Sequence, residues 1–298
     1  MDPLNVDLWT WDVGVTVASP QAYAALICDR VEESWSAGAD VVVFPEYAWM
    51  GLETFVTDQA RLDGVASLFW EQLWPGVQSR LARPGRAVVL GTVPYRTEAG
   101  KLRNRAPILC EGRVVYQDKL NLTPWETAFE RGDALHLWAL RGQTFAVVIC
   151  LDIEVPEISV ALRGRGVDCL LVPSATETVL GVERIGRCAS ARAVELGCCV
   201  GVSQLVGKMT SELVDENVGR LAWLVPSQAA FREALREQVT DGLIEEGFQR
   251  LRGVLNPAAL RLMRRSWVET NPARLTPEPI SVQDVGDQGP ASATHTSP

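Results

Sequence analysis

The stretch G-Q-T-F-A-V-V-I-C-L-D-I-E-V-P-E, residues 142–157, contains the change of pattern that decides how this chain folds. Residues 144–149 are apolar and rich in β-branched and aromatic types, which predicts a short buried strand. Cys150 stands where that strand should end, and the acidic residues behind it lead to a helix start near Pro156. Since α/β proteins place their chemistry at the carboxyl ends of such strands, Cys150 is a candidate nucleophile. Its alternative is the commoner one for a cysteine, a buried and inert thiol.

The composition is typical of a soluble globular protein and excludes several partners. Of 298 residues, 47% are hydrophobic and 22% are charged, and no apolar run is long enough to cross a bilayer. The first residues show no secretory signal, so we expect a cytoplasmic protein. A formal charge of −9 argues against nucleic acid and anionic membranes as partners. Seven cysteines without a C-x-x-C pair argue against a disulfide framework and a structural zinc site.

Strand and helix patterns alternate along most of the chain and predict one α/β domain over residues 1–270. No repeat or linker divides this span, whereas residues 271–298 are proline-rich and then small and polar, and we expect them to be disordered. The expected strands are 11–17, 41–44, 86–91, 105–110, 113–116, 144–149, 168–172, 198–203, 220–225 and 248–255. The expected helices are 21–37, 67–82 with a break at Pro75-Gly76, 156–164, 182–196, 227–239 and 257–265.

Three charged residues stand where reactive groups are expected. Glu46 follows the apolar strand at 41–44, and a carboxylate there is either solvated or held for use. Lys119 and Glu126 belong to a polar loop, residues 117–126, without strand or helix periodicity, and long loops on compact scaffolds often carry function.

Histidine, the usual partner of a catalytic cysteine, is scarce in this chain. His136 alternates with apolar residues like part of an edge strand, which favours a structural role, and His295 lies in the expected tail. If Cys150 reacts, its base is therefore expected to be a carboxylate, with a lysine as the fixed positive charge facing the oxyanion.

Five segments resemble motifs of the nitrilase, or carbon-nitrogen hydrolase, superfamily and occur in the family's order. They are V-V-V-F-P-E ending at Glu46, Y-Q-D-K-L around Lys119, V-V-I-C-L-D-I-E-V-P-E around Cys150, L-L-V-P-S-A from Leu170 and A-R-A-V-E-L from Ala191. The resemblance extends over roughly residues 7–268. It implies a single-domain, four-layer α-β-β-α sandwich, whose monomers usually pair through helices, so a homodimer or larger assembly is expected.

The same resemblance implies a Glu-Lys-Cys triad of Glu46, Lys119 and Cys150, with Glu126 as a second glutamate that positions the lysine and the substrate. Glu46 would take the thiol proton, and the thiolate would attack an amide carbonyl. Lys119 and the backbone N–H of Leu151 would stabilise the oxyanion before water hydrolyses the thioester. No metal or organic cofactor is expected.

The residues around the cysteine favour an amide over a nitrile as substrate. Amidase-type branches carry Cys-Tyr-Asp and nitrilases Cys-Trp-Glu, so Leu151 departs from both and Asp152 agrees with the amidases. The substrate pocket is expected to include Tyr47, Leu151, Ile153, Ser174 and Thr176. Charged residues near its rim could bind a charged substrate of either sign, and they are Glu177, Glu183, Arg184 and Arg187.

Two other functions stay open beside hydrolysis of an amide or a nitrile. One is an amide-forming acyltransferase, in which an amine outcompetes water at the thioester. The other is a catalytically silent interaction module, against which the intact Glu46, Lys119 and Cys150 argue. Gly197 also stands near a position where relatives often have asparagine, and the region after Pro226 is unlike common members, which leaves substrate and dimer contacts unassigned.

Overall fold

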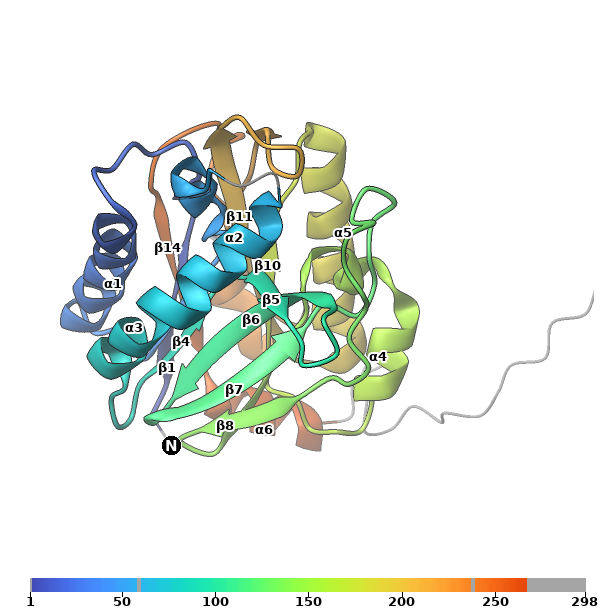
Figure 1. Ribbon diagram of the computed structural model, residues 1–298. Coiled ribbons are helices and arrows are strands. Elements are labelled where there is room, and N and C mark those ends of the chain that lie inside the picture. The colour runs from blue at the N-terminus through green and yellow to red at the C-terminus, as the bar shows by residue number, and fades with distance from the viewer. Residues whose placement is uncertain (1, 58–59, 237–238, 267–298) are drawn as a thin grey trace, which may run out of the picture.

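Two β-sheets packed face to face form the centre of the molecule, with helices on both outer faces (Figure 1). The computed structural model describes residues 2–57, 60–236 and 239–266, so the expected tail and His295 lie outside the described residues. The predicted four-layer α-β-β-α sandwich is confirmed. Within the described residues, no helix combines the length and the apolar character needed to cross a membrane.

The first sheet has seven strands and presents Glu46 at the end of one of its central members. β3 alternates between two cores: Val41 and Val43 face the second sheet, whereas Val42 and Phe44 pack under the outer helices. The strand order is β14 (Arg250–Leu255), β1 (Leu4–Trp9), β3 (Val41–Phe44), β4 (Ala87–Leu90), β6 (Leu102–Cys110) and β5 (Val93–Arg96), with β7 (Arg113–Asp118) also paired to β6.

The second sheet presents Cys150, since its strand β9 ends shortly before that residue. β9 and β10 run parallel, as do β10 and β11, with Leu171 opposite Val147 on one side and Gly201 on the other. The strand order is β12 (Glu216–Asn217), β11 (Cys199–Lys208), β10 (Cys169–Ser174), β9 (Gln143–Val147) and β8 (Leu137–Leu140), with β13 (Ala222–Leu224) and β2 (Trp11–Asp12) also paired to β11.

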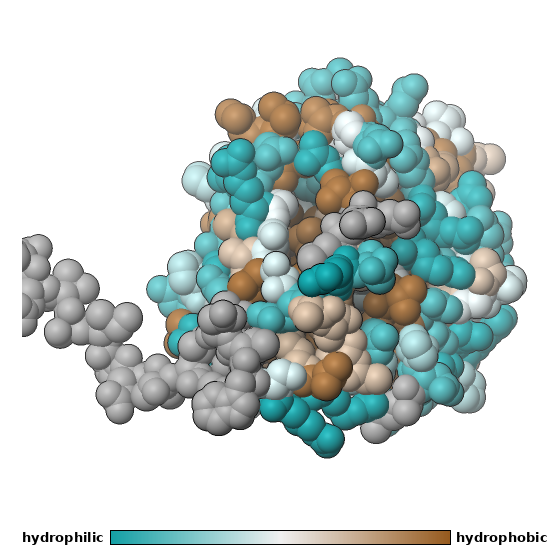
Figure 2. All heavy atoms as spheres, turned by 180° about the vertical axis from the view of Figure 1, so that it is seen from behind, coloured by the Kyte–Doolittle hydropathy of each residue, from teal (hydrophilic) through white to brown (hydrophobic). Residues whose placement is uncertain are grey.

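The helices cover the outer faces of the sheets according to their apolar stripes (Figure 1). α1 (Pro20–Ser36) begins at Ser19, whose side chain accepts from the Ala22 N–H, and it buries Tyr23, Ile27 and Val31 against the first sheet. The others are α2 (Arg61–Ser67), α3 (Trp74–Leu81), α4 (Pro156–Leu162), α5 (Val179–Leu196) and α6 (Pro257–Arg265), with 3₁₀ turns at Met50–Phe55, Cys150–Glu154 and Ala229–Arg236 and a π turn at Leu68–Leu73. The face turned away in Figure 1 mixes hydrophilic and hydrophobic residues (Figure 2).

Three sequence predictions differ from the observed elements. The first strand is Leu4–Trp9, and of the predicted 11–17 only Trp11–Asp12 form a strand. β1 can hold the buried Asp7 because Arg252 on the neighbouring β14 pairs with it, a partner that local sequence does not reveal. The predicted break at Pro75-Gly76 does not occur, since Pro75 occupies the first turn of α3 directly after the π turn. The predicted helix at 227–239 is a 3₁₀ segment at Ala229–Arg236.

Candidate active site

Glu46 lies at the carboxyl end of β3, where the chain turns sharply under the second sheet. The turn packs tightly, because a Cβ on Gly91 would lie 2.1 Å from the Pro45 carbonyl oxygen. Tyr47 then adopts a left-handed backbone conformation (φ 58°), and its N–H donates to the Thr92 hydroxyl at 2.8 Å. These contacts fix the direction of the Glu46 side chain, which is only 1% exposed.

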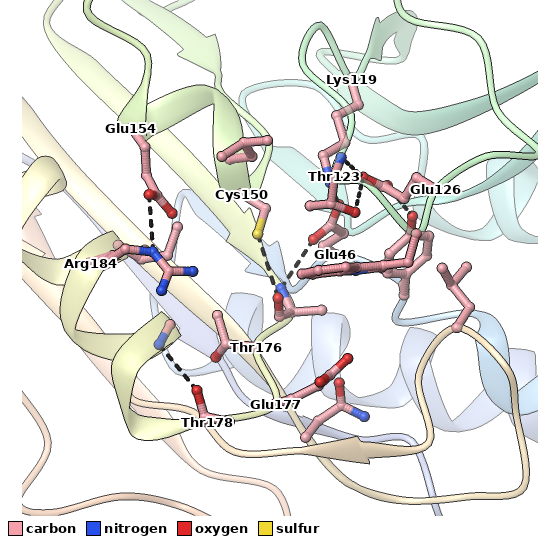
Figure 3. Close-up of a pocket in the computed structure, with 18 of the residues that line it drawn as sticks. Glu46, Lys119, Thr123, Glu126, Cys150, Glu154, Thr176, Glu177, Thr178 and Arg184 are labelled. Carbon is pink, nitrogen blue, oxygen red and sulfur yellow. Dashed lines mark hydrogen bonds and ion pairs between the residues drawn. The ribbon is translucent and has the colours of Figure 1, made fainter.

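Lys119 follows β7 and holds its ammonium group between two buried carboxylates. Its Nζ lies 2.8 Å from Glu46 Oε1 and 2.8 Å from Glu126 Oε2. Because both partners are charged and excluded from water, these charge-assisted hydrogen bonds are strong. The lysine is thereby held as a fixed cation beside Cys150 (Figure 3).

Neutral side chains complete the hydrogen bonding of the two glutamates. The Asn104 amide donates to Glu46 Oε1 at 2.9 Å and to Glu126 Oε1 at 3.4 Å. The Tyr47 hydroxyl donates to Glu126 Oε1, and the Thr123 N–H and hydroxyl donate to Glu126 Oε2 at 2.7 and 2.9 Å. Glu126 therefore has more donors than Glu46 and is held more firmly in its ionised form.

Cys150 occupies a strained turn directly after the second sheet. Its φ is 48°, a left-handed conformation that a non-glycine residue adopts only when its surroundings enforce it. The Sγ donates to the Ala175 carbonyl at 3.5 Å, while the Ala175 N–H donates to Glu46 Oε2 at 3.1 Å. The Glu46 carboxylate lies close enough for its charge to raise the pKa of the thiol, after burial as the larger cause. One oxygen of Glu46 thus accepts from Lys119, and the other accepts from the Ala175 peptide, whose residue also accepts from the Cys150 thiol.

Asp152 ties the cysteine turn to the lysine loop. Its buried carboxylate accepts the N–H groups of Leu120 at 3.1 Å and Asn121 at 2.7 Å, and the Asn121 amide at 2.8 Å. Burial raises the pKa of Asp152, and these three donors oppose the rise. The distance between Cys150 and Lys119 is therefore set by hydrogen bonds as well as by packing.

The two glutamates that share Lys119 have pKa values shifted in opposite directions. Burial raises the pKa of Glu46 to about 7, and the negative charge of Glu126 adds to the rise while Lys119 opposes it. Burial also acts to raise the pKa of Glu126, but Lys119 and then the Tyr47 and Thr123 donors outweigh it and lower that pKa. Glu46 can therefore exchange a proton near neutral pH, whereas Glu126 stays a carboxylate.

Lys119 and Cys150 both favour their protonated forms, since the pKa of each is raised. Burial acts to lower the pKa of Lys119, but the charges of Glu46 and Glu126 raise it overall. Burial and then the charge of Glu46 raise the pKa of the Cys150 thiol. The arrangement is thus a neutral thiol beside a fixed cation and a base that titrates near neutral pH, which suits transfer of the thiol proton during attack on a carbonyl.

A cavity of about 290 Å³ opens onto this cluster (Figure 3). All four predicted catalytic residues lie on its wall, as do three of the predicted pocket residues, Tyr47, Leu151 and Thr176. Ile153 and Ser174 are fully buried and do not line it. The 3₁₀ turn after Cys150 directs Ile153 into the core between the sheets, and β10 continues through Ser174 instead of ending before it.

The predicted rim residues divide between this cavity and the outer side of α5. Glu177 and Arg184 line the cavity, and Arg184 Nε pairs with Glu154 Oε2 at 3.2 Å. Glu183 and Arg187 lie instead on a separate depression between α5 and β11. In Figure 3 the Glu154 and Arg184 pair lies on the opposite side of Cys150 from Lys119 and Glu126.

Sequence reasoning missed Asn104, Thr123 and Glu154. Asn104 had a usable signal, since it stands at a buried position of the alternating strand β6, where a lone polar residue needs a partner. Thr123 and Glu154 had none, because their roles depend on how the loop at 117–126 and α5 approach the cysteine turn. Among the residues that the structure describes, no group of three His, Cys, Asp or Glu side chains could hold a metal ion.

The fold and the cysteine site together indicate an enzyme of the carbon-nitrogen hydrolase class. The chain belongs to the carbon-nitrogen hydrolase family, whose sequence pattern matches residues 6–225. This confirms the superfamily that the five motifs indicated. A relative, the probable hydrolase YhcX of Bacillus subtilis, is 26% identical over 222 residues, which are 72% of this chain and 42% of that protein. The chain thus spans less than half the length of that relative.

Three solved structures, two of them of nitrilase-superfamily proteins, share the fold at low identity. An amidase of Nesterenkonia sp. AN1 has a TM-score of 0.62 and 21% identity, covering 88% of this chain and 94% of its own. Nit3 of Saccharomyces cerevisiae has a TM-score of 0.65 and 18% identity, covering 92% and 97%. The glutamine-dependent NAD+ synthetase of Acinetobacter baumannii has a TM-score of 0.64 and 17% identity, covering 87% of this chain and 47% of its own.

Proposed function

We propose that this chain is a thiol amidohydrolase that cleaves the non-peptide C–N bond of a small carboxamide through a thioester on Cys150. The observation that carries the proposal is the buried cation of Lys119, held between Glu46 and Glu126 beside a strained cysteine at the base of a cavity. A binding module would gain nothing from burying three charged groups beside a thiol, because their desolvation is costly.

The mechanism follows from the two oxygens of Glu46. Oε1 is held by Lys119 and Asn104, which leaves Oε2 to accept the Cys150 proton as sulfur attacks the amide carbonyl. Lys119 and the backbone N–H of Leu151 stabilise the oxyanion. Glu46 then returns the proton to the departing ammonia or amine. In the second half it takes a proton from water, which attacks the thioester and releases the acid and the free thiol.

Two observations favour an amide as the substrate. Asp152 matches the amidase pattern and holds the lysine loop in place. Structures of the Nesterenkonia amidase include one in complex with acrylamide and one showing Michael addition of acrylamide at the active-site cysteine. A nitrile substrate and an acyltransferase that passes the acyl group to an amine are the alternatives on the same fold.

The proposal also covers the pairing of two copies of the chain, the extent of the hydrolase domain and the cellular compartment. Exposed apolar side chains on α4 and α5, namely Val160, Val179 and Leu180, support pairing of two copies through these helices. We also propose that the hydrolase domain extends to about residue 270, and that the protein is cytoplasmic, where free thiols such as its own persist.

The experiment is ammonia release from a panel of small carboxamides, ureas and nitriles, together with intact-protein mass spectrometry after quenching with a slow amide. We expect turnover of carboxamides and an acyl adduct that disappears in Cys150→Ala. The matched control is Cys188→Ala, which removes a partly buried free thiol of α5 that does not line the cavity. Undiminished turnover in Cys150→Ala would rule the proposal out. An added amine that captures the acyl group would instead identify an acyltransferase.

A further inference from the structure

A second cavity, about 560 Å³ in volume, adjoins the active-site cavity. The proposed reaction at Cys150 gives it no role. The two cavities share three wall residues, Trp125, Glu126 and Leu213. The two cavities therefore adjoin at these side chains, and we call the second one the distal chamber.

The wall of the distal chamber carries an excess of negative charge. Among its described residues, the carboxylates of Glu53, Asp63, Glu126 and Glu212 accompany a single cation, Arg61. Two of these carboxylates are already paired elsewhere, Glu126 with Lys119 and Asp63 with Arg96. The charge available to a ligand is thus that of Glu53 and of the exposed Glu212, with Arg61 as a partial counter-charge.

Glu53 is the residue that points to a ligand. Its side chain is 4% exposed, and Arg61 reaches only one of its oxygens, Oε1, at 3.2 Å. The other oxygen, Oε2, is buried and has no hydrogen-bond partner among the described residues. A buried carboxylate oxygen without a donor is costly, so a donor supplied by a bound molecule would stabilise it.

The remaining wall suits a hydrocarbon chain that ends in a cation. Trp125, at the junction of the two cavities, is 63% exposed and offers a large apolar face to a ligand. Phe129, Leu62 and Leu102 add apolar surface in the chamber itself. An indole face packs against methylene groups and also attracts an ammonium group.

We propose that the distal chamber binds the protonated amine of a linear ω-amino carboxamide, with the ammonium at Glu53, the aliphatic chain along Trp125 and the amide carbonyl at Cys150. The assignment depends on the proposed amide hydrolysis, since it names the substrate class of that reaction. The alternative to be tested is a substrate that ends in a carboxylate, because the Arg61 guanidinium would favour that group at the same end of the substrate.

The test is hydrolysis by the wild-type enzyme of three linear series, from the butanamide to the octanamide, that end in an ammonium, a methyl or a carboxylate group. We expect kcat/KM for the best ω-amino amide to exceed that of its methyl-ended counterpart by about tenfold or more, as one charge-assisted hydrogen bond allows. Glu53→Gln should abolish this preference and leave the methyl-ended amide within about twofold of wild type. Retained turnover of the methyl-ended amide also shows that the variant folds. The control Glu98→Gln makes the same change on an exposed turn outside both cavities.

Binding of hexylammonium, followed by calorimetry, separates the two proposals. Saturable binding to wild type that Glu53→Gln removes supports the chamber even if no amide is hydrolysed, a result that would overturn only the proposed reaction. Hydrolysis of methyl-ended amides without any preference for the amine, or a preference for the carboxylate series, overturns the chamber and leaves the reaction intact. Equal binding of hexylammonium to both proteins overturns the chamber as well.

Discussion

Two ion-paired groups face the same cavity and differ mainly in their contact with water. Lys119, Glu46 and Glu126 have side chains that are 1% exposed, whereas Arg184 and Glu154 are 60% and 20% exposed. Their N–O distances are similar, 2.8 Å in the buried cluster and 3.2 Å at the rim. Contact distance therefore does not distinguish them, and burial decides what each ion pair contributes to stability.

Burial makes the inner cluster costly to disturb. Removing one partner from a buried ion pair leaves an uncompensated charge and costs about 3–5 kcal/mol, whereas an exposed pair contributes about 0–1 kcal/mol. In the proposed reaction these buried charges also act on the substrate carbonyl, where weak screening makes them effective. Substitutions that break each ion-paired group in turn test whether burial causes the difference between them.

The largest effect is expected from Lys119→Met. The change removes the cation that faces the oxyanion and leaves Glu46 and Glu126 buried without their shared partner. We expect kcat/KM to fall by about 10³-fold and the free energy of unfolding to fall by about 3 kcal/mol, as measured by ammonia release and by denaturant unfolding. Lys101→Met is the matched control, since Lys101 pairs with Glu130 at 3.0 Å on the surface. Comparable losses in both variants would show that burial is not the deciding difference.

The next largest effect is expected from Asn104→Leu, which should change the pH dependence of the reaction. Only ionised Glu46 can accept the thiol proton, so kcat/KM should fall about tenfold per pH unit below the pKa of about 7 that burial gives Glu46. Asn104 donates to the ionised form of Glu46, so Asn104→Leu should raise the pKa of Glu46. The acid limb, which is the fall of kcat/KM at low pH, should then move to higher pH by about one unit. The activity lost at neutral pH should return at higher pH.

The shift of the acid limb separates a positioning role from a packing role. Asn5→Leu is the control, because Asn5 donates to the Gly38 carbonyl, away from the cavity. It can change stability but should leave the acid limb in place. An unshifted limb in Asn104→Leu would assign Asn104 to the fold alone.

The sequence predicted the buried sheets better than their edges, for a physical reason. β3 is a continuous apolar run, and β9 and β10 lie largely within such runs, so local composition identifies them without a partner. β1 was missed because Asp7 fits a buried strand only when Arg252, 245 residues away, neutralises it. Local patterns cannot report such a distant partner.

The sequence predicted those site residues that stand directly after a recognisable strand. Glu46 and Cys150 follow apolar runs directly, so their types and positions were visible in the sequence. The sequence did not show which oxygen of Glu46 faces Lys119. That choice depends on Asn104 from β6 and on the peptide of Ala175 after β10. Side-chain hydrogen bonds between distant strands require the fold to be known.

The smallest effect is expected from Arg184→Gln at the rim. Its pair with Glu154 is largely hydrated and screened by salt, so the free energy of unfolding should change by less than about 1 kcal/mol. Denaturant unfolding at low and high salt measures this change, which should shrink further as salt is added. A loss as large as that in Lys119→Met, or one that salt does not reduce, would mean that the rim pair lies in a surrounding as dry as the inner cluster. The exposed fractions of the side chains would then fail to predict what each ion pair contributes to stability.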